Sequence, residues 1–429
     1  MRIPVAADRV RHKVSRLFEY IVPFSLVLIF GGCPSEQPTS LEKPLALFRQ
    51  NKLEEALPLF ERLVAQQEES AEAHIWLAET YRRLEQPERA IEQAEIALEL
   101  EPCNSFALTV LADASVPKPG DADPANSQAS WDHLMAAIEC DSAYGSAWVS
   151  LWGLAIRRGE IDMLHKSLRM IRETGFLTDA ALSFGRWLLR TLPENAILIT
   201  NGDMDTYPAM AVQETEGFRT DVTVVERGLL NLPWGLRFFR DHGEVPLPFE
   251  DSELDQLSPL ENDEGETVYP ADLVLRGWVS GIRFGSYPRP VALAVTVYES
   301  FYEDYKEYLQ YAGPYFLIHP APPPGSRNVG ALRQCLQGIE ENDFEGPWVS
   351  GQDHSLIRGL YTKEIAKNIT FSALSYAEEM IGEGKLKAAE KTLDWAEKFE
   401  RKTELGPVYT RRIAELRDAA TSGREYPEE

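Results

Sequence analysis

Two aspartates separated by one residue, Asp203 and Asp205, directly follow a short apolar run at 196–200. Enzymes that transfer sugars from nucleotides often hold Mg²⁺ or Mn²⁺ with such a pair, because these cations prefer hard oxygen ligands. In the alternative, Asn201 and Asp203 order a tight turn, and Asp205 or Thr206 caps the helix that follows. The residues themselves leave both options open, so we assign no cofactor.

More polar residues flank a second apolar run at 221–226. Arg227, Asn231 and Trp234 come after this run, and Arg219 precedes it. The two arginines could hold an anion beside the aspartates, but we expect them to form ion pairs that fix the loop. The candidate ligand-binding residues are Asn201, Asp203, Asp205, Thr206, Arg219, Arg227, Asn231 and Trp234.

The two apolar runs are typical of buried strands, since both are rich in β-branched residues. A strand, a loop, a helix and a second strand within ~30 residues make a βαβ unit, which implies parallel strands and a right-handed crossover. Further strands are predicted at 290–297 and 315–319. We expect a small, Rossmann-like parallel α/β domain over 191–325. Ligands in such sheets bind beyond the carboxyl ends of the strands.

The preceding segment, 41–190, has helical periodicity and a repeat of 34 residues. Leu77 and Ala78 recur as Leu111 and Ala112, and Ala90 recurs upstream as Ala56. This spacing resembles the tetratricopeptide repeat (TPR), in which small residues let two antiparallel helices pack closely. A similar pattern returns at 350–420, where we expect a TPR-like hairpin and a capping helix. The predicted fold class is therefore all-α plus α/β, with a helical array flanking a small sheet.

The central region also resembles a known family. The run 192–208, which contains Asn-Gly-Asp-x-Asp-Thr-x-Pro, and the run 229–234 have counterparts in a bacterial family of glycosyltransferase-like, multi-spanning membrane proteins of poorly defined function. The resemblance covers the soluble C-terminal region of that family, roughly residues 190–400 here. The family's membrane-embedded half is replaced by the TPR-like array. The resemblance therefore implies a fold and a binding role, but not the transferase activity.

The composition excludes several other classes of protein. The 429 residues carry 43 Lys and Arg against 68 Asp and Glu, a formal net charge of −25. Such a surface repels phosphate backbones, so we expect no nucleic-acid partner. Four cysteines are too few for a disulfide-built scaffold. A bridge between Cys103 and Cys140 is one option, but we expect these two and Cys335 to be buried thiols.

The N-terminus predicts a location. A basic segment at 2–16 precedes an apolar run at 20–30 and then Gly31-Gly32-Cys33. This pattern is typical of a secretory signal peptide, and its end resembles the lipobox of bacterial lipoproteins. We therefore predict a signal peptide at 1–32, lipidation of Cys33 and a tether at 33–40. The alternative is an uncleaved anchor or an ordinary signal sequence. The expected location is a bacterial membrane surface, facing the periplasm or the exterior.

These patterns together predict a lipid-anchored TPR scaffold of the cell envelope, without enzymatic activity, that holds a protein or glycan partner. A membrane glycosyltransferase is one candidate partner. The alternative function is a carbohydrate-active enzyme, a glycan-modifying transferase or hydrolase, that uses Asp203 and Asp205.

Overall fold

The computed structural model describes residues 40–116, 124–262, 265–337, 339 and 358–422. The predicted signal peptide, Cys33 and nearly all of the predicted tether lie outside the described residues. The description below concerns the compact unit that begins at Ser40. Within the described residues, no helix is long and apolar enough to cross a membrane.

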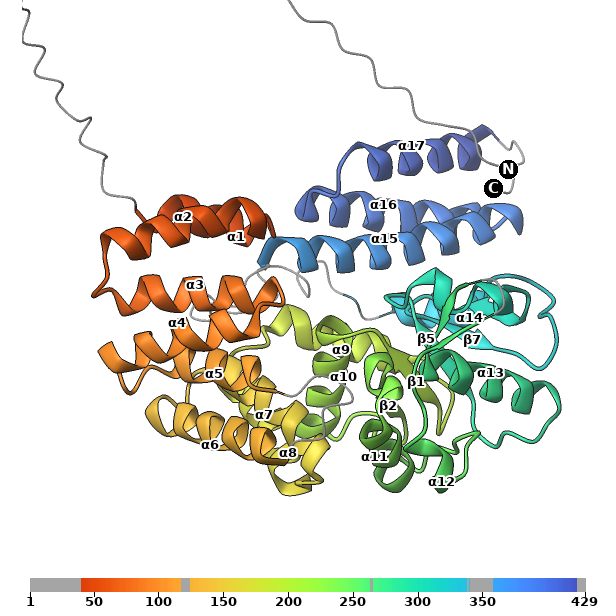
Figure 1. Cartoon of the computed structure of the whole chain (residues 1–429). Helices are drawn as coiled ribbons and strands as arrows, with labels where there is room; N and C mark the ends of the chain where they lie inside the picture. Colours follow the sequence, from red (N-terminus) through yellow and green to blue (C-terminus); the bar gives the residue numbers. More distant parts are fainter. Residues whose placement is uncertain (1–39, 117–123, 263–264, 338, 340–357, 423–429) are drawn as a thin grey trace, which may run out of the picture. The chain divides into compact units, whose positions relative to one another are not determined.

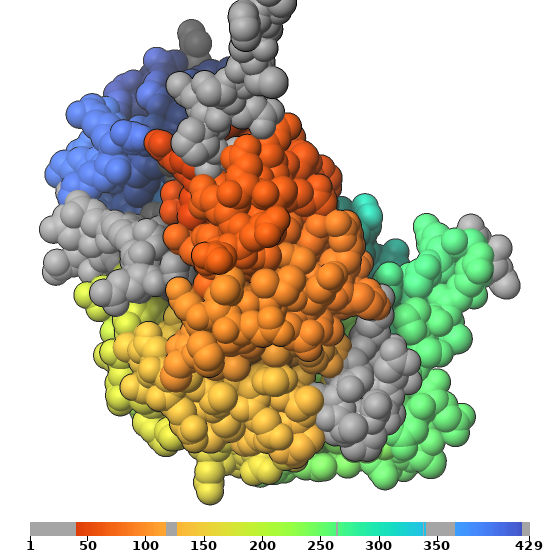
Figure 2. Space-filling model, turned by 60° about the vertical axis from the view of Figure 1, so that its left-hand side comes forward, coloured from red at the N-terminus to blue at the C-terminus, as the bar shows by residue number. Residues whose placement is uncertain are grey.

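The first helices of the chain pair into antiparallel hairpins, each packed against the next (Figures 1 and 2). Helices α3 and α5 begin 34 residues apart, as the repeat predicts. The alanines that recur with this period are fully buried, which allows the close approach of the helices. The elements are α1 (Glu42–Arg49), α2 (Leu53–Gln66), α3 (Ala71–Arg83), α4 (Pro87–Leu100), α5 (Ser105–Ala114), α6 (Pro124–Cys140), α7 (Gly145–Arg158) and α8 (Ile161–Glu173).

Local signals set the ends of several of these helices. The hydroxyl of Ser70 accepts the N–H of Ala73 and caps α3, and the side chain of Asn104 caps α5 in the same way. Helix α7 ends at Gly159, whose left-handed backbone (φ 72°) only glycine adopts without cost. The turn between α7 and α8 therefore follows from its sequence.

One expectation about the cysteines is wrong. Cys103 and Cys140 form a disulfide, with their Cα atoms 5.4 Å apart. These residues lie at equivalent ends of two successive hairpins, so the stacking of the repeats brings them together. Cys335 is a free, buried thiol, as expected.

The sheet has the strand order β2-β1-β5-β7-β6. Strand β1 pairs in parallel with β2 on one side and with β5 on the other, and Ile197 lies opposite both Thr223 and Val291. Strands β5, β7 and β6 pair antiparallel. The strands are β1 (Ile197–Thr200), β2 (Thr223–Glu226), β5 (Val291–Ala294), β6 (Leu309–Tyr311) and β7 (Tyr315–Ile318).

The prediction of a wholly parallel sheet is therefore corrected to a mixed sheet. The short connections from β5 through β6 to β7 are the reason, because a parallel crossover needs a dozen or more residues, usually a helix, between adjacent strands. The helices around the sheet are α9 (Asp179–Arg190), α10 (Asp203–Glu216), α11 (Pro233–Gly243), α13 (Pro270–Arg283) and the short 3₁₀ segments η1 (Arg227–Asn231), η2 (Glu299–Phe301) and η3 (Glu303–Tyr308).

The helical array and the sheet share one hydrophobic core. Strand β1 is buried along its whole length, and the same cluster of apolar side chains continues through α7, α8 and α9. At this junction the ring of Trp152 from α7 meets the ring of Tyr207 from α10 edge to face, with centroids 5.0 Å apart. Shared burial of this kind holds the strand ends in a defined position against the array.

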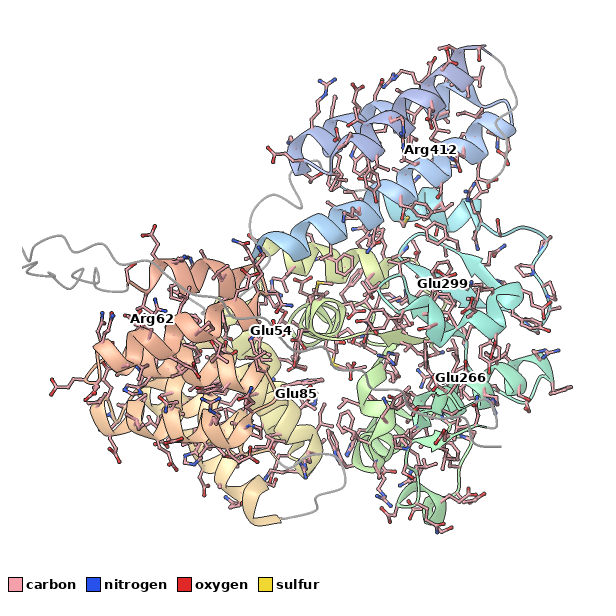
Figure 3. All side chains as sticks on the ribbon, turned by 45° about the horizontal axis from the view of Figure 1, so that its top comes forward. Glu54, Arg62, Glu85, Glu266, Glu299 and Arg412 are labelled. Atoms are coloured by element: carbon pink, nitrogen blue, oxygen red, sulfur yellow. A yellow bond between two sulfur atoms is a disulfide. The ribbon has the colours of Figure 1, made fainter. Side chains whose placement is uncertain are left out.

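The chain ends in further helices (Figure 1). Between α15 and α17, Arg412 pairs with Glu378, and Figure 3 labels Arg412 in this group of helices. Small buried residues, Ala373, Ala377 and Ala396, form the core of the group. The remaining elements are α12 (Asp251–Leu254), β3 (Leu260–Glu261), β4 (Thr267–Val268), α14 (Val329–Leu336), α15 (Arg358–Gly382), α16 (Leu386–Thr403) and α17 (Pro407–Ser422).

Candidate functional site

The loop after β1 turns directly into α10, whose first turn contains both aspartates of the Asp-x-Asp pair. Asp205 points inward and is 1% exposed. Its Oδ2 accepts the backbone N–H of Asn201 at 2.9 Å and the hydroxyl of Thr296. Burial raises the pKa of this carboxyl group to about 6, although the two hydrogen bonds counteract part of the rise. Asp205 thus ties the end of β1 to the segment after β5.

This geometry favours the turn-ordering alternative for Asp205. Among the residues that the structure describes, no group of three or more His, Cys, Asp and Glu side chains is arranged to hold a metal ion. Mg²⁺ and Mn²⁺ take several oxygen ligands, and the Oδ2 of Asp205 already has two donors. Metal binding by Asp203 and Asp205 stays a prediction.

Asn201, Thr206 and Arg227 are brought together with Asp205 at the carboxyl ends of β1 and β2. The hydroxyls of Thr206 and Thr200 lie 2.7 Å apart and are buried. The Nε of Arg227 donates to the Oδ1 of Asn201 at 3.0 Å, which joins the two strand ends. The guanidinium of Arg227 also lies 5.4 Å from the ring centre of Phe301. These contacts fix the loops of the site.

Asn231 and Trp234 support neighbouring elements instead. The Oδ1 of Asn231 accepts the backbone N–H of Ala271 at 3.0 Å, in the first turn of α13. Trp234 packs on the hydrophobic core at the start of α11. Both contacts connect the segment after β2 to helices outside the strand-end loops.

The expectation that Arg219 lies beside Asp203 is corrected by the strand register. Arg219 precedes β2, whereas Asp203 follows β1, and parallel strands place these positions at opposite edges of the sheet. There the guanidinium of Arg219 donates to both carboxylate oxygens of Asp221 at 2.8 Å and to the carbonyls of Leu189 and Leu192. Arg219 therefore forms the structural ion pair, which was the favoured option.

Sequence reasoning missed the residues that α3 and α5 bring to the site. The carboxylate of Glu79 holds Arg82 and Arg83, each at 2.7 Å. Although burial alone would raise the pKa of Glu79, the two guanidinium groups lower it below its ordinary value. The charge of Arg82 also reaches Asp113 of α5. Glu79 and Asp113 are 34 residues apart, so an acidic residue recurring with the repeat was the available signal.

Asp203 lies between these groups and the strand ends. Loss of hydration raises the pKa of its carboxyl group, Glu226 and Asp113 raise it further, and Arg83 and Arg82 lower it. Yet Asp203 is exposed at the protein surface. A carboxylate that is both accessible to water and poorly hydrated lies in a concave part of the surface. The site thus combines residues of the array with residues of the sheet.

Family comparisons match two parts of the chain. Residues 44–104 match the tetratricopeptide repeat, and the described helices follow its 34-residue period. The chain is accordingly a TPR protein with the architecture of a protein-interaction scaffold. Residues 181–249 match TMEM260-associated domain 2, which is consistent with the membrane-protein resemblance seen in the sequence. No curated protein matches the chain.

Solved structures of TPR proteins are also similar. A thermophilic TPR protein of Thermus thermophilus has 20% identity over 41% of this chain and 92% of its own, with a TM-score of 0.29. MamA has 16% identity over 47% of this chain and 96% of its own (TM-score 0.27). YrrB, described as having an unusual peptide-binding site, has 14% identity over 47% and 86% (TM-score 0.26). These scores are low, so the fold assignment rests on the repeat match and the helices themselves.

Proposed function

We propose that the protein is a lipid-anchored scaffold of the bacterial cell envelope that holds a protein partner on the inner layer of its TPR array. The TPR array is the observation that carries this proposal. Stacked repeats of this kind create extended concave surfaces, and such surfaces bind other chains.

The first helices of successive hairpins support the choice of this layer. Helix α3 contacts α5, and α5 contacts α7, so the three form a continuous layer. The side chains of Arg82 and Arg83 keep 30% and 25% of their surface exposed there. Charged groups that are held by neighbours and still accessible are suited to binding a partner, because little ordering entropy remains to be lost.

Two observations support a location outside the cytoplasm. The Cys103–Cys140 disulfide is typical of oxidising compartments. The Gly-Gly-Cys33 sequence after a basic and an apolar segment is typical of a lipoprotein signal. Cys33→Ser should release the protein from the membrane fraction and remove the mass of the lipid. A variant that stays membrane-bound with unchanged mass would contradict lipidation.

The partner can be captured by photo-cross-linking in intact cells of the source organism. A photoreactive residue replaces Arg83 on α3, and a matched control replaces Arg62 on α2, the exposed second helix of a hairpin (Figure 3). We expect a discrete cross-linked protein from position 83 and none, or much less of it, from position 62. Equal cross-linking from both positions, or no discrete product from either, would refute the scaffold function.

A further inference from the structure

Two polar groups at the start of α10 lack partners. Among the described residues, no group donates a hydrogen bond to the carboxylate of Asp203, and the hydroxyl of Tyr207 neither donates nor accepts one. Positions i and i+4 of a helix lie on the same face, so both side chains are directed to the same side of α10. Glu226, at the end of the neighbouring strand β2, completes what we call the strand-end cluster: Asp203, Tyr207 and Glu226.

Tyr207 gives evidence for a ligand that is independent of the acidic residues. Only 8% of Tyr207 is exposed, and its unpartnered hydroxyl is not among the fully buried polar atoms. The hydroxyl is therefore the accessible tip of an otherwise buried side chain. Burial raises the pKa of Tyr207 well above its ordinary value, and the charges of Asp203, Glu226 and Asp113 raise it further, so the hydroxyl faces these carboxylates. A nearly buried polar group without a partner is costly unless a ligand completes it.

The charges around the cluster leave a negative excess. The charges of Arg82 and Arg83 are matched by Glu79, which holds both, and by Asp113, which also accepts the hydroxyl of Ser150. Glu226 accepts the backbone N–H groups of Gly228 and Leu229, but its charge remains. Asp203 and Glu226 are thus the uncompensated charges, and the field between the array and the strand ends attracts a cation.

We propose that the strand-end cluster binds an arginine or lysine side chain of the protein partner. The cationic group lies against Asp203 and Glu226, and the hydroxyl of Tyr207 donates to a main-chain carbonyl of the same segment. A peptide matches both features, because it offers a cation and a hydrogen-bond acceptor close to each other. This inference rests on the proposed function for the source of the cation and names the chemistry by which the partner is recognised.

The groups present favour a basic side chain over a metal ion. No described group of three or more acidic, His or Cys residues has the geometry of a metal site. An ammonium or guanidinium group needs only hydrogen-bond acceptors and tolerates an aromatic neighbour. Tyr207, packed against Trp152, provides that neighbour.

Binding of a defined probe tests the proposal with the full chain. The probe is an acetylated and amidated tri-arginine peptide, and its neutral counterpart is the same peptide with three citrullines. Isothermal titration compares the wild type with Asp203→Asn and Tyr207→Phe. The matched control is Asp162→Asn, which removes an exposed aspartate from the first turn of α8 and reports attraction by net charge alone. Circular dichroism confirms that each variant is folded.

We expect the wild type to bind tri-arginine at least tenfold more tightly than tri-citrulline. Asp203→Asn should weaken binding of tri-arginine at least fivefold, Tyr207→Phe about threefold and Asp162→Asn less than twofold. Equal binding of the two peptides, an equal effect of the Asp203 and Asp162 variants, or no binding by the wild type at millimolar peptide would overturn the proposal.

The outcomes separate this inference from the proposed function. A partner that is cross-linked at position 83 equally well in the Asp203→Asn background refutes the basic-side-chain site and leaves the scaffold intact. Binding of tri-arginine that depends on Asp203, without any cross-linked protein, refutes the scaffold and leaves the cation site.

Discussion

The Cys103–Cys140 disulfide should stabilise the helical array strongly. The bridge closes a loop of 37 residues that spans α5 and α6. In the chain-entropy description, a cross-link lowers the entropy of the unfolded chain according to loop length, and a loop of this size corresponds to about 4 kcal/mol at 25 °C. The double variant Cys103→Ser with Cys140→Ser should therefore lose about 4 kcal/mol of unfolding free energy.

Urea denaturation followed by circular dichroism measures this loss in the full chain. Cys103 is exposed at the surface, so dithiothreitol should reduce the bridge in the folded wild type and give the same loss. The control is the double variant, whose stability should not change with dithiothreitol. A difference below about 1 kcal/mol between the oxidised wild type and the double variant would refute the loop-entropy reasoning.

Three further predictions concern the elements that position the site. Gly185→Ala should cost about 1–3 kcal/mol in urea denaturation, because its Cβ would lie 2.4 Å from a backbone oxygen of α10; Gly153→Ala, which meets nothing within 4 Å, should be neutral or stabilising. Burial raises the pKa of Asp205 to about 6, so its folded form binds the proton more tightly than the unfolded chain. Wild-type stability should then fall by about 3 kcal/mol relative to Asp205→Asn as pH rises from about 4 to 7, and parallel urea curves for the two proteins would contradict this. The hydrogen bonds from Arg219 lower the pKa of Asp221 to about 2, so its contribution is present above about pH 4 and is lost toward pH 2; Arg219→Met should abolish that acid-dependent part of the unfolding curve.

Local patterns were sufficient for much of the fold. The 34-residue recurrence of alanines predicted the helical hairpins, because close helix packing requires small residues at fixed intervals. The apolar runs at 196–200 and 221–226 predicted adjacent parallel strands, and β1 and β2 pair with Ile197 opposite Thr223 and Thr200 opposite Glu226. Such features depend on the nearest neighbours in the chain or on a single period, and a sequence displays both directly.

The antiparallel strands were not predicted, because an apolar run shows that a strand is buried but not which way its neighbour runs. The disulfide was left open for a related reason. Two cysteines 37 residues apart can meet only if the hairpins stack in a given way, and the sequence states the spacing but not the stacking. The inward orientation of Asp205 likewise depends on Thr296, which comes from a different strand end.

The sequence by itself determined that the chain contains a repeat array, a βαβ unit and an Asp-x-Asp pair at the end of a strand. Only the tertiary structure decided that the first of these aspartates lies beside charges carried by α3 and α5, far earlier in the chain. The physical reason is that electrostatic fields depend on distance in space and on hydration. Both are set by the common core that joins the array to the sheet.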